Sequence, residues 1–135
     1  MAKLIWNKEM ETGISRIDQQ HHDIFMMLDE LVGLLEKEVK DPAVIEIVRT
    51  MSKHTIEHFF SEEIYMSKHA YPEYEKHKAL HSALVKQLME FTSKMVDGRF
   101  QNPEEIIEFM KRNVLDHIYE EDLALGEYLR SKGVS

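Results

Sequence analysis

Residues 58–81 read HFFSEEIYMSKHAYPEYEKHKALH. Within them, His58 and Glu62 form one pair four positions apart, and His77 and His81 form another. Side chains at this spacing lie on the same face of a helix, one turn apart. Pro72 stands between the two pairs, and proline is favoured at the first position of a helix. The segment therefore predicts two helices, each carrying two polar, metal-ligand-type side chains on one face.

Apolar residues on both sides of this segment extend the same faces and predict two further helices. They recur at alternating spacings of four and three, which is typical of one buried helix face. No segment shows the sustained alternation of a half-buried strand. The stripe residues are Ile17, His21, Ile24, Leu28, Leu31 and Leu35 in the first helix; Val44, Val48, Met51, Thr55, His58, Glu62 and Tyr65 in the second; Tyr74, His77, His81, Leu84, Leu88, Phe91 and Met95 in the third; and Ile107, Met110, Val114 and His117 in the fourth.

Prolines mark where three of these helices are expected to begin. Pro42 and Pro103 follow Asp41 and Asn102, whose side chains suit helix N-caps, and Pro72 opens the third helix. Short connections between long helices favour antiparallel neighbours. We therefore expect an all-α, up-down-up-down four-helix bundle that forms a single domain over residues 1–135, with an irregular N-terminal arm and helices at roughly 16–38, 42–68, 72–96 and 103–131.

The composition excludes several classes of function. The chain has 17 basic and 25 acidic residues, a formal net charge of −8, which disfavours a nucleic-acid or anionic lipid partner. It has 0 cysteines, so disulfides, thiolate metal sites and cysteine nucleophiles are excluded. No apolar run approaches the roughly 20 residues that a membrane span requires, and the N-terminus does not resemble a signal peptide. We expect a cytoplasmic protein with no nucleic-acid or membrane partner.

Five histidines and a glutamate occupy stripe positions that a soluble bundle normally fills with apolar side chains. Burying so many titratable groups without partners would be costly, whereas metal coordination would satisfy them together. The register also separates two adjacent histidines: His21 continues the stripe of Ile17 and Ile24, while His22 points about 100° away, toward solvent. The candidate ligands from the stripes are His21, His58, Glu62, His77, His81 and His117.

These donors narrow the choice of metal without fixing it. Imidazole with carboxylate and no thiolate suits iron, copper, nickel, zinc or manganese. The ligands are too many for one ion, so two ions that share carboxylates are expected. Ferritin-like di-iron enzymes use paired Glu-x-x-His motifs. No histidine of this sequence has a glutamate three positions before it, which disfavours that oxygen-activating class.

The ordered motifs of the chain resemble those of the hemerythrins, specifically the single-domain bacteriohemerythrins. After an early Trp6, the resemblance runs over nearly the whole length and is specific because of the order and gaps of its pieces. The matching pieces are IDQQH at 17–21, HFFSEE at 58–63, Met66 followed by Tyr71 and Pro72, HKALH at 77–81 and HIYEED at 117–122.

This resemblance implies two iron ions in a non-haem di-iron centre with an oxo or hydroxo bridge. Two octahedral iron ions offer about 12 coordination positions in total, and five histidines, two bridging carboxylates and one bridging oxygen fill all but one of them. The open position lies on the iron that has two histidine ligands. Dioxygen would bind there. The implied ligands are His77, His81 and His117 for one iron and His21 and His58 for the other, with Glu62 and Asp122 bridging both.

One implied ligand departs from ideal helix geometry. Asp122 lies five residues after His117, about 140° around an ideal helix, whereas Glu121 would align better. We follow the family pattern and predict a π-type distortion between His117 and Asp122. Glu63, beside a ligand, is interpreted as a solvated charge in preference to a group that orients an imidazole. His54 is interpreted as a surface residue or as one that supports a ligand, but not as a ligand itself.

The function implied by the resemblance is reversible dioxygen binding, for oxygen transport, storage or delivery to an oxygen-requiring enzyme, without enzymatic activity. Imidazoles outnumber carboxylates in the ligand set, which favours the ferrous state over high-valent iron. We expect Ile24, Leu28, Leu84 and Ile118 to keep water from the pocket. The alternatives are a di-iron oxidase or peroxidase, a protein that senses or scavenges nitric oxide or oxygen, and a bundle that stores or senses iron or zinc.

Overall fold

The computed structural model describes residues 6–37, 42–97, 105, 108–109 and 111–135. Three long helices run through it: α1 (Ser15–Glu36), α2 (Pro42–Lys68) and α3 (Tyr74–Val96). The last segment is helical at 105 and 108–109, forms π-helical turns at Lys111–Leu115 and Ile118–Asp122, and ends in α5 (Leu123–Ser131). No strand occurs among the described residues, so the expected all-α class is confirmed.

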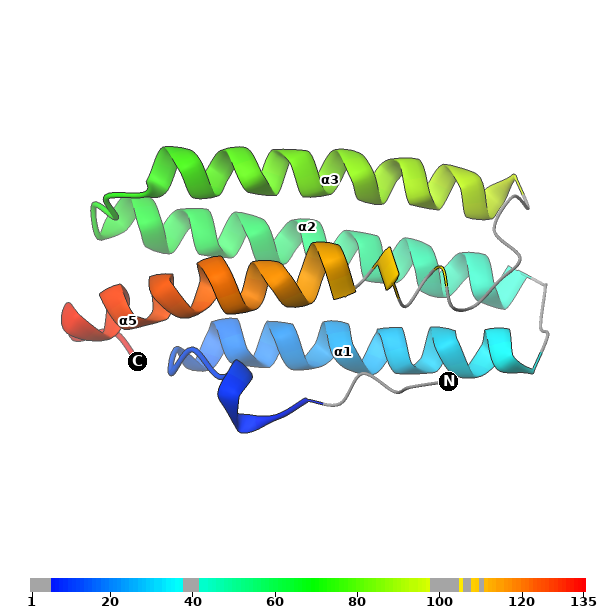
Figure 1. The fold of residues 1–135 in the computed structure, drawn as a ribbon, viewed down its shortest axis with the longest axis horizontal. Helices are drawn as coiled ribbons and strands as arrows, with labels where there is room; N and C mark the ends of the chain where they lie inside the picture. The colour runs from blue at the N-terminus through cyan, green and yellow to red at the C-terminus, as the bar shows by residue number, and fades with distance from the viewer. Residues whose placement is uncertain (1–5, 38–41, 98–104, 106–107, 110) are drawn as a thin grey trace.

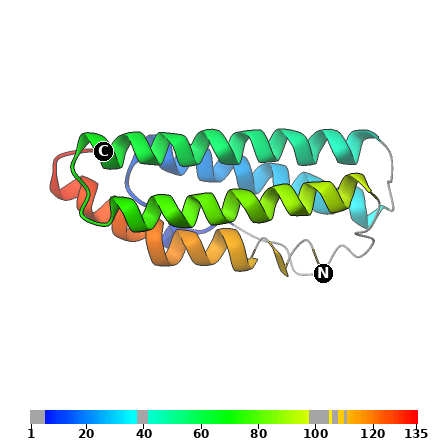
Figure 2. The same ribbon diagram turned by 90° about the horizontal axis from the view of Figure 1, so that it is seen from above.

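The helices lie side by side and alternate in direction, as in an up-down-up-down bundle (Figure 1). Seen from above, α2 and α3 run antiparallel, and the segment that ends in α5 lies next to α3 (Figure 2). In Figure 1 the same segment lies next to α1. The predicted bundle topology is therefore confirmed. None of the described helices combines the length and apolarity that a bilayer span requires.

The helix ends differ slightly from the sequence prediction. α1 begins at Ser15 and ends at Glu36, two residues before the expected end. α3 begins at Tyr74 and not at Pro72, because Tyr74 N–H donates to Tyr71 O in a turn that precedes the helix. The predicted start at residue 103 lies outside the described residues.

The N-terminal arm is fastened to the bundle by polar contacts at the start of α1. The carboxylate of Asp18 accepts hydrogen bonds from the backbone N–H of Thr12 at 2.7 Å and of Gly13 at 3.1 Å. On the other side, a Cβ at Gly126 of α5 would lie 2.5 Å from the carbonyl oxygen of Thr12, so only glycine permits this approach. The irregular arm predicted from the sequence is thus packed between α1 and α5.

Two apolar clusters lie at different levels of the bundle and leave a polar level between them. In α1, α2 and α3, the polar level falls at the residues around His21, His58 and His81. One cluster consists of Leu28, Leu31, Val32, Val44, Val48, Met51 and Phe91. The other consists of Ile14, Ile17, Met66, Tyr71, Leu125 and Leu129.

Candidate metal centre

All seven predicted ligands are brought together in the polar level of the bundle. Each is at least 93% buried, with exposed fractions from 0% for Glu62 to 7% for His117. α1 supplies one of them, α2 and α3 supply two each, and the last helical segment supplies two. The seven are His21, His58, Glu62, His77, His81, His117 and Asp122.

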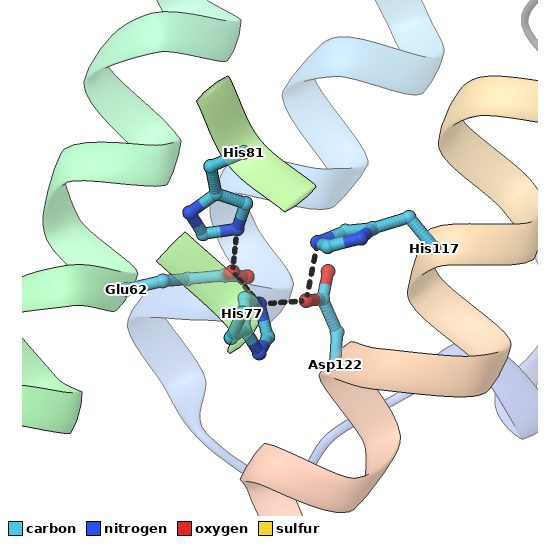
Figure 3. Close-up of side chains that lie close together, drawn as sticks. All are labelled: Glu62, His77, His81, His117 and Asp122. Carbon is cyan, nitrogen blue, oxygen red and sulfur yellow. Dashed lines mark hydrogen bonds and ion pairs between the residues drawn. The ribbon is translucent and has the colours of Figure 1, made fainter. Parts of the chain in front are cut away.

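Three histidines gather around one side of the two carboxylates (Figure 3). The Nε2 atoms of His77 and His81 lie 3.1 and 3.0 Å from Oε1 of Glu62. The Nε2 atoms of His77 and His117 each lie 3.1 Å from Oδ1 of Asp122. One donor atom from each of these five residues falls within 4.8 Å of every other, close enough for a single ion to contact all of them.

The other two histidines face the opposite oxygen atoms of the same carboxylates. Nε2 of His58 lies 2.8 Å from Oε2 of Glu62, and Nε2 of His21 lies 3.0 Å from Oδ2 of Asp122. With both carboxylates, these histidines form a second group whose donor atoms lie within 4.8 Å of one another. Glu62 and Asp122 therefore each present one oxygen to a group of three histidines and the other oxygen to a group of two.

Many of these close contacts do not have hydrogen-bond geometry. Within the described part of the chain, the buried Nε2 atoms of four of the histidines, Oε2 of Glu62 and both Asp122 oxygens have no hydrogen-bond partner, although oppositely charged groups are near. Leaving buried polar atoms unsatisfied costs about 1–3 kcal/mol each. Nitrogen and oxygen donors that converge without hydrogen-bond geometry suit metal ions, and imidazole with carboxylate suits iron among the first-row metals. These residues therefore fit the iron ions that the sequence resemblance implies.

A π-helical turn brings Asp122 onto the same side of its helix as His117. The turn covers Ile118–Asp122 and is closed by a bond from Leu123 N–H to Ile118 O, five residues apart. A π turn shifts the chain by one residue relative to an α-helix. The predicted distortion is confirmed, and it is Asp122, 1% exposed, that enters the centre, while Glu121 stays half-buried outside it.

Two polar side chains contact the Nδ1 atoms of histidines of the centre, on the ring edge away from Glu62 and Asp122. Oε2 of Glu63 lies 3.1 Å from Nδ1 of His81, so the solvated-charge interpretation of Glu63 was wrong. Oε1 of Gln20 lies 2.7 Å from Nδ1 of His58. Sequence reasoning missed Gln20, because its contact crosses from α1 to α2 and periodicity within one helix does not reveal such a contact. The adjacent His22 and the nearby His54 are exposed, as expected.

The two buried carboxylates favour protonated histidines beside them. Burial opposes protonation of His21 and His77, but the close carboxylates of Asp122 and Glu62 outweigh it and raise their pKa values to about 9 and about 10. Burial alone would raise the pKa of Glu62, yet the charge of His58 and the closeness of the other histidines hold it well below its usual range. The donor atoms thus form a proton-sharing cluster, and these protons must be released before a metal ion can bind.

A small cavity of about 20 Å³ opens on the two-histidine group. Of the four residues expected to shield the pocket, Ile24 and Ile118 line it, whereas Leu28 and Leu84 do not. Leu28 belongs to the neighbouring apolar cluster. The cavity is lined by His21, Ile24, Phe25, Thr55, His58, Phe59, Asn113, Val114, His117, Ile118 and Asp122.

The N-terminal arm closes the outside of this wall. Trp6 packs against Phe25 with ring centroids 5.5 Å apart and against His21 at 6.2 Å. Met10 is fully buried and packs with Phe25 and Ile118. The arm therefore adds an apolar layer behind the side chains that face the cavity.

Comparisons with known proteins show the family to which the chain belongs. The family model described as hemerythrin HHE cation binding domain matches residues 12–129. Bacteriohemerythrin of Stenotrophomonas maltophilia is 29% identical over 97% of this chain and 84% of its own, and bacteriohemerythrin of Clostridium acetobutylicum is 27% identical over 87% and 95%. A crystal structure of wild-type hemerythrin superposes with a TM-score of 0.85 at 26% identity, covering 95% of this chain and 98% of that one. The chain belongs to the hemerythrin family.

Proposed function

We propose that this protein binds two iron ions at the centre and holds dioxygen reversibly beside the two-histidine iron. One observation carries the proposal: Glu62 and Asp122 each turn one oxygen to a group of three histidines and the other to a group of two. Two carboxylates arranged in this way suit a pair of ions that share them. The ligands we assign are His77, His81 and His117 for one ion, His21 and His58 for the other, and Glu62 and Asp122 for both.

The cavity supports the choice of the two-histidine side for the ligand. It contacts both His21 and His58 but only His117 of the other three histidines, and its volume of about 20 Å³ exceeds the roughly 10–15 Å³ that one water requires. Apolar side chains such as Ile24 and Ile118 make up much of the remaining wall. A small uncharged molecule fits this space, whereas larger reductants do not, and the mostly apolar wall offers a water molecule few hydrogen-bond partners.

The composition of the centre supports binding over oxidation. Its five neutral imidazoles outnumber two carboxylates, a set with less negative charge than carboxylate-rich di-iron sites, and this stabilises the ferrous state. We propose transport, storage or delivery of oxygen to an oxygen-requiring enzyme as the use of this binding. A cytoplasmic location stays a prediction from the sequence.

An oxygen-electrode measurement separates binding from turnover. The iron-loaded, reduced protein is mixed with a known amount of dissolved dioxygen and then purged with inert gas. A reversible carrier returns the dioxygen that it took up, in proportion to its iron content. Continuous consumption in the presence of a reductant would instead support the oxidase or peroxidase alternative.

A further inference from the structure

The two halves of the centre differ in the charge of the side chain that contacts Nδ1 of a histidine. On the two-histidine side, Nδ1 of His58 faces the neutral amide of Gln20 at 2.7 Å. On the three-histidine side, Nδ1 of His81 faces the carboxylate of Glu63 at 3.1 Å. Neither Gln20 nor Glu63 belongs to the ligand set, and each contacts only one of the two histidine groups.

The orientation of the Gln20 amide is fixed by a second contact. Its Nε2 donates a hydrogen bond to Oγ of Ser61 at 3.1 Å, which leaves Oε1 facing His58. A carbonyl oxygen can only accept a hydrogen bond, so His58 must carry its hydrogen on Nδ1. The lone pair of His58 Nε2 is then free for a metal ion, which is the tautomer that coordination needs.

The carboxylate of Glu63 selects the same tautomer at His81. Because an ionised carboxylate only accepts, Nδ1–H of His81 donates to it and Nε2 stays free. The ring plane is also fixed, since Phe59 stacks on His81 with centroids 4.1 Å apart and an interplanar angle of 11°. The side chain of Glu63 is 21% exposed, and it reaches an imidazole that is 2% exposed.

We propose that Gln20 and Glu63 are positioning residues that make the two metal positions electronically unequal. A carboxylate draws the Nδ1 proton of its histidine more strongly than an amide does, so it makes the imidazole a stronger, more anionic donor. Glu63 thereby favours the oxidised state of a metal at the three-histidine position. Gln20 orients His58 without that added charge and leaves the two-histidine position, beside the cavity, the poorer in negative charge.

A metal titration tests the positioning role without using dioxygen. Co²⁺ is titrated anaerobically into the metal-free protein by calorimetry, for wild type, Gln20→Leu and Glu63→Leu. Each substitution is expected to weaken one of two binding steps by about 10–100-fold and to leave the other unchanged. The matched controls are Gln19→Leu on α1 and Glu57→Leu on α2, which are exposed and should change neither step.

The isosteric variants Glu63→Gln and Gln20→Glu separate charge from simple packing. Glu63→Gln keeps an acceptor and should bind Co²⁺ almost as wild type does, and the Nδ1–H signals of His58 and His81 in ¹⁵N NMR of the Zn²⁺ form should persist. In the iron-loaded protein, Glu63→Gln should raise the midpoint potential and Gln20→Glu should lower it. We expect at least a tenfold change in the redox equilibrium, about 59 mV for one electron.

The two levels of the account fail in different ways. Shifts of potential in the same direction for both isosteric variants, or leucine variants that weaken both Co²⁺ steps equally, would overturn the assignment of Gln20 and Glu63. The inference rests on the proposed two-metal centre, yet it is independent of oxygen chemistry. Selective weakening in a protein that does not release dioxygen would keep the inference and reject reversible binding.

Discussion

Oδ1 of Asp122 lies 3.1 Å from Nε2 of His117, although five residues separate the two along the chain. An ideal α-helix would point these side chains about 140° apart. The π-helical turn Ile118–Asp122 removes that mismatch, at the cost of a less regular hydrogen-bond ladder. The distortion thus places a short carboxylate where it faces both groups of histidines, and π turns are frequent at functional sites.

The first prediction compares the two adjacent acidic residues of this turn. Asp122→Asn should lose at least one of the two irons, because it removes the charge that faces His21, His77 and His117. Glu121→Gln should keep full iron content, since its carboxylate lies outside the centre. Metal analysis of both purified variants checks this. Loss of iron from Glu121→Gln with retention in Asp122→Asn would show that the bridging residue is misassigned.

The second prediction concerns the carboxylate of α2. Glu62→Gln keeps the shape of a fully buried side chain but removes the charge that both histidine groups face, so both irons should be lost or bound far more weakly. Glu57→Gln on the exposed side of the same helix is the control and should bind iron as wild type does. Iron per chain after dialysis against a weak chelator is the measurement. A Glu62→Gln protein with full iron content would contradict a shared carboxylate.

The third prediction is a pH dependence of the metal-free protein. The pKa values of His21 and His77 rise from 6.5 to about 9 and about 10 on folding, so the folded state binds more protons than the unfolded state between these values. Their contribution to stability is complete below pH 6.5 and is lost as the pH rises through 9 to 10. The depressed pKa values of Glu62 and Asp122 have the opposite effect, and their contribution is lost in acid.

Urea unfolding followed by circular dichroism, with a chelator present, measures this dependence. The free energy of unfolding should fall by a few kcal/mol, as an order of magnitude, between pH 6.5 and pH 10. His22→Asn, which changes an exposed histidine, should show the same curve as wild type. A metal-free protein whose stability is flat or rises over this range would contradict the proton-sharing cluster.

The fourth prediction is that metal binding releases protons. At pH 7, the raised pKa values keep His21 and His77 protonated in the metal-free protein, and a metal ion binds only the neutral imidazole. Binding of Zn²⁺ at pH 7 should therefore release about two protons per chain. Calorimetry in buffers of different ionisation enthalpy counts them. Heats that do not depend on the buffer would mean that the ligands are neutral before the metal arrives.

The fifth prediction concerns the cavity wall. Ile24→Thr places a hydroxyl in the apolar wall beside the two-histidine group and should let water approach, so the oxygenated iron protein should autoxidise several-fold faster. Leu84→Thr is the matched control, because Leu84 lies outside the lining and should have little effect. The decay of the oxygenated form in visible spectra gives both rates. Equal acceleration by the two substitutions would remove the cavity from the account.

Most of the centre was predictable because its residues repeat along single helices. The pairs His58 with Glu62 and His77 with His81 follow directly from a spacing of four, and the register of α1 correctly turned His21 inward and His22 outward. Asp122 did not follow from periodicity. Only the family pattern favoured it over Glu121. The π-helical turn that positions it departs from the α-helical period, so that period could not predict it.

The residues that were mispredicted depend on how one helix is placed against another. The contact of Gln20 with His58 crosses from α1 to α2, and that of Glu63 with His81 crosses from α2 to α3. Leu84 lies on the predicted inner stripe of α3, yet the cavity is formed by other helices. A single sequence gives the inward face of each helix, but not the axial offset and rotation between helices that decide such contacts.

The most direct test of the central claim is an oxygenation cycle followed by optical spectra and metal analysis on one sample. The iron-loaded protein is reduced without oxygen, exposed to air and then purged, while its visible charge-transfer bands are recorded. The account predicts two irons per chain and bands that appear with oxygen and disappear on purging. One iron per chain, or no oxygen-dependent bands at full iron loading, would contradict a di-iron dioxygen-binding centre.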